Sequence, residues 1–210
     1  AALSKRLLSA DVVNSSDEQI KILERYFYNQ LSIYPHFAGI YMGTPDGNFY
    51  DVRRSDTHAA GGFRTKIIAH RGGVRTTDLI WYDSEFNMLS KSSDPEDRYD
   101  PRKRPWYQKA FLKKQIVWTD PYIFFTSKKP GITIAGPFYD NANRLKGIVG
   151  VDIEIDQLST FISSLKIGKN GRAFLMNRNR DIIAFPDLAK LKFEGAGQQT
   201  GERLAKIDEL

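Results

Sequence analysis

The segment YDPRKRPWY, from Tyr99 to Tyr107, concentrates three aromatic residues, three cations and two prolines in nine positions. Arg104 carries a planar set of donors that matches a carboxylate through two parallel hydrogen bonds. Trp106 adds an indole donor and a flat apolar surface, and the two tyrosines add hydroxyl groups on rigid rings. Because such groups lose little conformational freedom on binding, the segment predicts a site for a small anion.

Two other uses of this segment stay open at the level of composition. Trp106 and Tyr107 open an expected short helix, where aromatic residues often only fill a core. Basic residues mixed with aromatic ones also suit single-stranded nucleic acid, but no second cluster of this kind extends the track. The net charge of +6 comes from scattered basic residues rather than one patch, so we expect no nucleic-acid partner.

A second candidate group lies in IVGVDIEID, which alternates as a strand does. Alternation places the valines and isoleucines on one face and Asp152 on the other. If the apolar face packs on a helix, Asp152 points into whatever covers the opposite face and can bind a ligand ammonium group. The alternative is that Asp152 and Glu154 simply face water.

Patterns typical of enzymes and metal sites are missing from the sequence. There is no cysteine, which excludes disulfides, thiol catalysis and cysteine-ligated zinc. The three histidines have no metal-binding spacing, and neither a nucleophile elbow nor a phosphate-binding glycine loop occurs. DPEDRYD gathers four carboxylates but lacks the ligand spacing and final Glu of a calcium loop. We therefore expect no enzyme activity, no metal and no cofactor.

These groups have to be positioned by a chain of 210 residues, enough for one large domain or two small ones. We expect helix over about residues 3–34, as one long helix or as two in line with a bend near Asn14. Ser15 and Glu18 form a capping box for the second stretch, and Pro35 ends it. Its apolar stripe follows helical spacing and comprises Ile20, Leu23, Phe27, Leu31 and Tyr34.

Strand patterns dominate the middle of the chain. AGIYMGT and FYDVRR flank a PDGN turn, and GGFRTKIIAHR and DLIWYDSEFNML follow as further strands. PWYQKAFLKK predicts a short helix with proline in its first turn. PYIFFTS, GITIAGPFYD and KGIVGVDIEI complete the pattern. We predict an antiparallel sheet of about five strands within about residues 37–156, and hence an α+β architecture.

The pattern restarts at Asp156. DQLSTFISSL predicts a second short helix, and a hairpin follows with strands at Arg172–Asn177 and Asp181–Phe185. The expected organisation is therefore a helix at 1–35, a first module at 36–156 and a smaller, incomplete second module at 157–210.

Taken in order, these motifs resemble the double Cache family of extracytoplasmic sensor domains. The resemblance rests on Tyr99-x4-Arg104-x-Trp106-Tyr107, then PY and GVD, together with GPFYD, GIVGVDI and GKNGRAFLMN, and covers essentially the whole chain. It implies a long N-terminal helix along two PAS-like modules, membrane-distal and membrane-proximal, with antiparallel sheets. It also implies a periplasmic domain of an inner-membrane chemoreceptor, histidine kinase or cyclic-nucleotide enzyme.

The resemblance further implies a set of ligand contacts, because amino-acid-binding members hold the ligand carboxylate and amino group with residues of these motifs. By position, the implied contacts are Arg104 and Trp106 with the carboxylate, Tyr107 and Asp152 with the ammonium group, and Tyr99 and Tyr122 as pocket walls. Amine-binding relatives carry an acid where this chain has Phe124, and this departure favours an amino acid over a bare amine.

The prediction is a ligand-binding sensor domain for an α-amino acid. A plain carboxylate such as lactate or pyruvate, held by Arg104 with Asp152 idle, is one alternative, and a protein-interaction module without a small ligand is another. The opening AALSKRLLSADVV, without an initiator Met, predicts a piece of a longer, membrane-anchored protein. We also expect a homodimer formed through the N-terminal helix.

Overall fold

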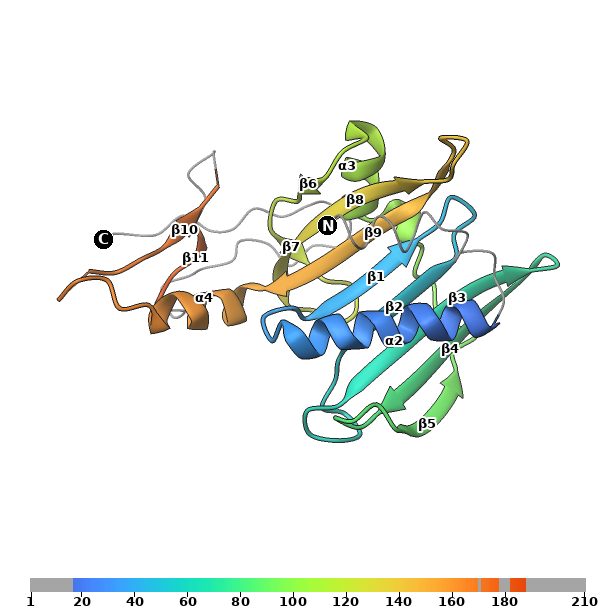
Figure 1. Cartoon of the computed structure of the whole chain (residues 1–210), viewed down its shortest axis with the longest axis horizontal. Coiled ribbons are helices and arrows are strands. Elements are labelled where there is room, and N and C mark those ends of the chain that lie inside the picture. The colour runs from blue at the N-terminus through green and yellow to red at the C-terminus, as the bar shows by residue number, and fades with distance from the viewer. Residues whose placement is uncertain (1–16, 170, 178–181, 188–210) are drawn as a thin grey trace. The chain divides into compact units, whose positions relative to one another are not determined.

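The computed structural model describes residues 17–169, 171–177 and 182–187 of the chain (Figure 1). A helix is followed by a nine-stranded antiparallel sheet, so the predicted α+β class is confirmed. The strand order is β5-β4-β3-β2-β1-β9-β8-β6, β7 pairs with β8, and β10 and β11 form a separate two-stranded sheet. In chain order the elements are α2 (Asp17–Ile33), β1 (Gly39–Gly43), β2 (Phe49–Arg54), β3 (Phe63–Arg71), β4 (Val74–Tyr82), β5 (Met88–Ser93), a 3-10 turn (Pro101–Lys103), α3 (Pro105–Lys113), β6 (Val117–Trp118), β7 (Tyr122–Ile123), β8 (Pro130–Tyr139), β9 (Leu145–Glu154), α4 (Ile155–Ser164), β10 (Leu175–Met176) and β11 (Ile182–Ala184).

The chain divides into two compact units. Unit 1 comprises Ala1–Val117 and Ile134–Val151, and unit 2 comprises Trp118–Thr133 and Asp152–Leu210. The strands β8 and β9 therefore each contribute residues to both units. The predicted division into a first module at 36–156 and a second at 157–210 rests on the restart of the sequence pattern and stays a prediction.

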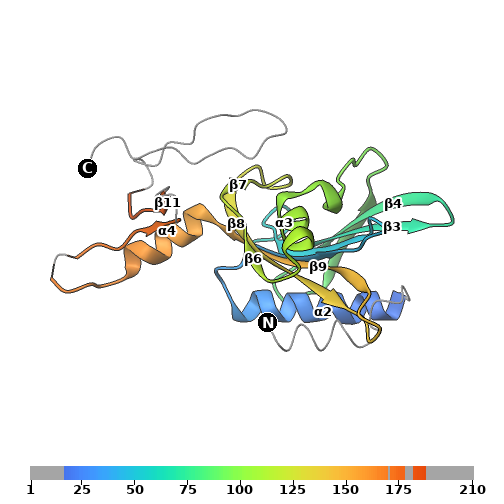
Figure 2. The same ribbon diagram turned by 90° about the horizontal axis from the view of Figure 1, so that it is seen from above.

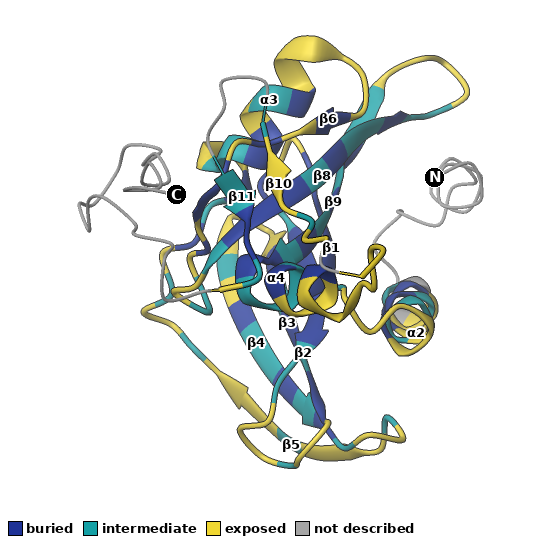
Figure 3. Ribbon diagram, turned by 90° about the vertical axis from the view of Figure 1, so that its left-hand side faces the viewer, coloured by how far each residue is buried: buried dark blue, intermediate teal, exposed yellow. Residues whose placement is uncertain are grey.

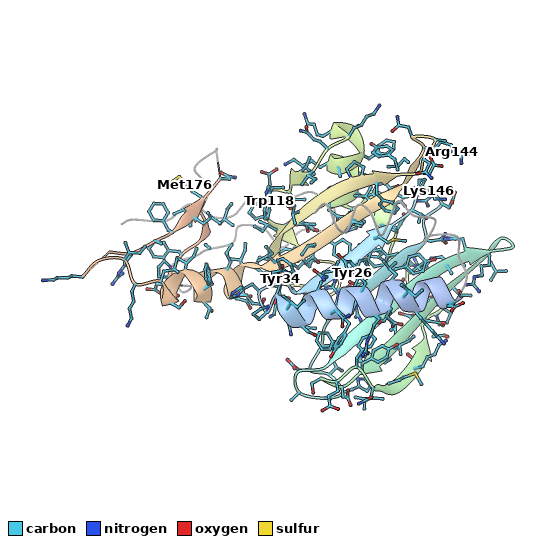
Figure 4. The ribbon with its side chains drawn as sticks, in the orientation of Figure 1. Tyr26, Tyr34, Trp118, Arg144, Lys146 and Met176 are labelled. Atoms are coloured by element: carbon cyan, nitrogen blue, oxygen red, sulfur yellow. The ribbon has the colours of Figure 1, made fainter. Side chains whose placement is uncertain are left out.

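Helix α2 covers one face of the strands in unit 1 (Figure 1). Its buried stripe is the predicted one, with Leu23, Phe27 and Leu31 in the core, and the helix ends at Ile33 as expected. Tyr34 was wrongly placed in that stripe. Tyr34 follows the helix (Figure 4) and is 48% exposed. Its ring packs against Phe37, with the ring centroids 5.1 Å apart. The part of the predicted helix before residue 17, including its Ser15 cap, lies outside the described residues.

The sheet is larger than the predicted five strands. DLIWYDSEFNML was expected as one strand, but a turn at residues 83–87 divides it, and the polar β5 pairs beyond it. The Asp83 carboxylate holds this turn by accepting hydrogen bonds from the backbone N–H groups of Glu85 (2.9 Å) and Asn87 (2.8 Å). Most of β5 is exposed (Figure 3), and it carries no apolar alternation that would have predicted it.

The two faces of the sheet in unit 1 differ in chemistry. Ile40, Met42, Tyr50 and Val52 alternate onto the face that packs on α2. The intervening residues of β1 and β2 alternate onto the opposite face, on the side of α3 (Figure 2). That face carries aromatic and charged side chains, and it is where the candidate site residues of unit 1 gather.

Unit 2 contains β7, α4 and the β10–β11 hairpin. The helix predicted from DQLSTFISSL is α4, and Ile155 and Phe185 form a small core with Ile182 packed against it. The predicted hairpin is present, with strands shorter than expected. None of the described helices is both long and apolar enough to span a membrane. In residues 17–169, 171–177 and 182–187, no three His, Cys, Asp or Glu side chains gather as metal ligands would.

Candidate ligand-binding site

The segment that leads into the candidate site is anchored by Asp97. Its carboxylate accepts hydrogen bonds from Lys66 Nζ at 2.7 Å and from an Arg75 guanidinium nitrogen at 2.8 Å. Arg75 also donates to the carbonyl of Tyr99 at 3.1 Å. Burial alone would raise the pKa of Asp97, but the hydrogen bonds and charges of Lys66 and Arg75 hold it below its ordinary value. This ion-pair network fixes the backbone just before Tyr99 onto β3 and β4.

Local sequence then sets the direction of Arg104. The Asp100 side chain caps the 3-10 turn at Pro101–Lys103 by accepting a hydrogen bond from the Arg102 N–H. Arg104 follows in an extended conformation, with φ −89° and ψ 147°, and Pro105 occupies the start of α3. This confirms the expectation that a residue before proline leaves the helical region. Arg104 therefore projects from the point where the loop becomes a helix.

The four predicted residues of unit 1 gather around one aromatic group. Trp106 is 1% exposed, and its ring centroid lies 4.8 Å from that of Tyr41. Phe49 bridges Trp106 and Tyr99, with centroid distances of 6.4 Å and 4.6 Å. The structure brings together Tyr99, Arg104, Trp106 and Tyr107, with the Arg104 Cζ 6.0 Å from the Tyr99 ring centroid and the Trp106 and Tyr107 centroids 5.5 Å apart.

Gly150 supports this aromatic group from β9. A Cβ atom added at Gly150 would lie 2.3 Å from Tyr41 Cε2, closer than real Cβ contacts allow. The strand can approach Tyr41 only because the residue is glycine. Its neighbours Val149 and Val151 pack against the core on the α2 side, as the alternation predicted.

In unit 2, three polar side chains form a hydrogen-bonded chain. The Thr133 hydroxyl donates to Asp152 Oδ1 at 2.7 Å, and the Tyr122 hydroxyl lies 2.7 Å from the same Thr133 oxygen. Because a hydroxyl has only one proton, Tyr122 donates to Thr133, which donates to Asp152. Asp152 is 3% exposed, so the alternative in which it faces water is wrong. Glu154 is also buried and pairs with Lys129 at 2.7 Å.

A buried ionic cluster on β2 and β3 escaped the sequence analysis. Asp51 is fully buried and binds Arg53 at 2.9 Å and Arg64 at 3.1 Å, and in the register of β2 and β3 it lies opposite Lys66. Burial would raise the pKa of Asp51, but these cations hold it below its ordinary value. The alternation in FYDVRR could have indicated this cluster. It places Asp51 on the face of the strand opposite to that of Tyr50.

The candidate residues thus form two groups, one in each unit. Tyr99, Arg104, Trp106 and Tyr107 cluster in unit 1, whereas Tyr122 and Asp152 are joined through Thr133 in unit 2. Each group is ordered by its own contacts. Their joint use by one ligand stays a prediction.

The fold is that of the Cache/PDC class of sensor domains. Residues 53–160 match the model of the family described as methyl-accepting chemotaxis protein-like, first PDC sensor domain, and the chain belongs to this family. This confirms the resemblance drawn from the sequence motifs.

Individual relatives agree with that assignment. The methyl-accepting chemotaxis protein McpB of Bacillus subtilis is 41% identical over 111 residues, 52% of this chain and 15% of that protein. Adenylate cyclase 1 of Rhizobium meliloti is 26% identical over 156 residues, 68% of this chain and 23% of that protein. The chain thus spans a small part of the curated relatives that it matches.

Solved structures show the same fold. The ligand-binding domain of the Campylobacter jejuni chemoreceptor Tlp3, in complex with L-norvaline, has a TM-score of 0.58 at 16% identity and covers 90% of this chain and 60% of that chain. The ligand-binding domain of the Pseudomonas aeruginosa amino acid chemoreceptor PctB, in complex with L-Arg, has a TM-score of 0.53 at 25% identity, covering 89% and 64%.

Proposed function

We propose that this domain is the extracytoplasmic sensor of a bacterial transmembrane receptor and that it binds an α-amino acid as its signal. The domain acts by binding and carries no catalysis of its own. The ligand contacts in this proposal are Arg104 and Trp106 with the carboxylate, Tyr107 and Asp152 with the ammonium group, and Tyr99 and Tyr122 as walls.

The setting of Arg104 carries this proposal. Its guanidinium lies over the Tyr99 ring beside the buried Trp106, on the sheet face that α2 does not cover. A guanidinium over an aromatic ring is weakly hydrated and keeps its planar donors, which suits two-point binding of a carboxylate. Asp152 supports the proposed binding of the ligand ammonium group, because the Thr133 hydroxyl orients the buried Asp152 carboxylate. A buried carboxylate held in this way can bind an ammonium group by a charge-assisted hydrogen bond.

The receptor context is proposed from the relatives. A chemotaxis receptor is the favoured whole protein, with a histidine kinase of a two-component system or a cyclic-nucleotide enzyme as other outputs of the same kind of sensor. In this proposal the domain lies in the periplasm, is anchored in the inner membrane in the full-length protein, and forms a homodimer through its N-terminal helix.

Isothermal titration calorimetry of the 210-residue domain against amino acids and the corresponding hydroxy acids tests the proposal. Arg104→Ala should reduce affinity for every ligand by 30-fold or more, since losing one partner of a buried charge pair costs about 2–5 kcal/mol. Asp152→Asn should weaken amino acids by about 1.5–3 kcal/mol and leave hydroxy acids unchanged or tighter. Lys103→Ala is the control, because Lys103 is exposed beside the same motif.

Three results would contradict the proposal in different ways. Equal losses from Arg104→Ala and Lys103→Ala would indicate a diffuse positive surface. Equal binding of lactate and alanine by Asp152→Asn and the native chain would favour a plain carboxylate sensor. No heat with any metabolite, from a folded domain, would favour a protein-interaction module.

A further inference from the structure

On the sheet face beside Tyr99, the buried and partly buried side chains of unit 1 carry more positive than negative charge. Two carboxylates there pair with four cations, a formal excess of two positive charges before Arg104 is counted. The side chains of the cations are between 7% and 28% exposed, and the cluster consists of Asp51, Asp97, Arg53, Arg64, Lys66 and Arg75. Buried charge of one sign is costly unless another ion compensates it.

Arg64 is the least satisfied member of this cluster. One of its terminal nitrogens donates to Asp51 Oδ2 at 3.1 Å, but Arg53 already donates to both oxygens of that carboxylate. The Arg64 side chain is only 14% exposed, and its Nε is buried. This Nε has no hydrogen-bond partner in the part of the chain that the structure describes. A buried N–H of a charged group without an acceptor is destabilising, and an incoming anion would satisfy it.

The cluster adjoins the proposed carboxylate site through Tyr99. The Lys66 Nζ lies 5.0 Å from the Tyr99 ring centroid, and the Arg104 Cζ lies 6.0 Å from the same centroid. The two cations are therefore at most about 11 Å apart, the sum of these two distances. Arg64 shares the β3 face with Lys66, because residues two apart in a strand point the same way.

We propose that the ligand carries a second carboxylate, so that the signal is an acidic α-amino acid. Its α-carboxylate binds Arg104, and its side-chain carboxylate binds the Arg64 Nε and the excess positive charge around Lys66. Two hydrogen bonds of about 2.8 Å at the ends leave at most about 5 Å between Lys66 and Arg104 for the ligand itself, which limits it to a small diacid. This inference rests on the proposed function and narrows its ligand class.

Isothermal titration calorimetry with isosteric pairs tests the inference. L-aspartate is compared with L-asparagine, and L-glutamate with L-glutamine, on the whole 210-residue domain at fixed salt. The native chain should bind the acid of at least one pair tenfold or more tightly than its amide. Arg64→Gln should bring that ratio to within threefold of one, while the affinity for the amide changes less than threefold. Arg144→Gln is the matched control, because Arg144 is exposed in the β8–β9 turn (Figure 4).

The outcomes separate this inference from the proposed function. Native domain that binds amides as tightly as acids overturns the acidic-ligand inference and leaves the amino-acid proposal standing. A ratio unchanged in folded Arg64→Gln also overturns it, because the charge cluster would then not face the ligand. A folded domain that binds no amino acid of any kind overturns both. If Arg64→Gln does not fold, the acid-to-amide affinity ratio of the native domain still decides the inference. Arg64→Lys, which keeps the charge, then replaces Arg64→Gln and should retain part of the preference for the acid.

Discussion

The Thr133→Val exchange tests the hydrogen-bonded chain of unit 2 directly. Valine keeps the shape of threonine, and Thr133 is fully buried, so the substitution removes a hydroxyl with little change in volume. It breaks two 2.7 Å hydrogen bonds, one donated by Tyr122 and one donated to Asp152. The backbone bonds of this residue with Thr119, both 2.9 Å, are expected to remain.

The expected effect follows from what the two neighbours lose. A hydrogen bond to a charged group contributes about 1.5–3 kcal/mol, and a buried hydroxyl left without its acceptor costs about 1–3 kcal/mol. The extra apolar contact of valine offsets part of this, so we expect a loss of about 3 kcal/mol in the free energy of unfolding. Affinity for an amino acid should fall about tenfold, because Asp152 loses the hydroxyl that orients it.

Urea denaturation followed by circular dichroism measures the first effect, and calorimetric titration the second. Thr133→Ser keeps the hydroxyl and should cost about 1 kcal/mol, the scale of a deleted methyl group. In the Thr133→Val background, Tyr122→Phe should cost less than in the native chain, since the hydrogen bond between the Tyr122 and Thr133 hydroxyls is already gone. A loss below about 1 kcal/mol in the free energy of unfolding of Thr133→Val would refute the hydrogen-bonded chain. Simple additivity of the losses from Thr133→Val and Tyr122→Phe would refute it as well.

Two further predictions concern unit 1. Gly150→Ala should displace the Tyr41 ring from Trp106. We expect urea denaturation to show a free energy of unfolding lower by about 1–3 kcal/mol, and calorimetric titration to show weaker ligand binding. Unchanged affinity would show that this aromatic group does not support the site. The folded pKa of Asp97 lies below its ordinary value of 3.8, so its contribution to stability should be constant above that pH and be lost as pH falls through the folded pKa. Asp97→Asn should flatten this loss of stability at low pH, which urea denaturation at pH 2–7 measures. It should also destabilise the protein at neutral pH by about 3–5 kcal/mol, because Lys66 then stays buried without its Asp97 partner. A parallel pH dependence of stability in both proteins would contradict the lowered pKa of Asp97.

Periodicity predicted the elements that bury a single apolar face. Phe27 and Leu31 lie where helical spacing placed them, and Val149 and Val151 pack on the α2 side as strand alternation required. The X-Pro rule correctly predicted the extended conformation of Arg104. These predictions succeed because each depends on a local backbone preference or on one burial pattern.

The predictions that were wrong or absent depend on tertiary pairing. Strand β5 exists because β4 offers it an edge, not because its own polar sequence favours a strand. The role of Thr133 also had no local signal, because a single threonine in an apolar strand gains its meaning only from Tyr122 and Asp152. The candidate residues themselves were found by motif order, which local periodicity alone does not supply.

The contrast between the two faces of the unit 1 sheet is itself an argument for a binding role. The α2 face is a continuous apolar core, which is sufficient to order the strands. The opposite face buries the Asp51 carboxylate beside Arg53 and Arg64, and the Lys66 ammonium group near the Tyr99 ring. Replacing such buried ions with apolar residues is often neutral or stabilising. Stability alone therefore does not account for them. The proposed acidic ligand would account for them, because it needs charged partners and its carboxylates would compensate the charge excess of this face.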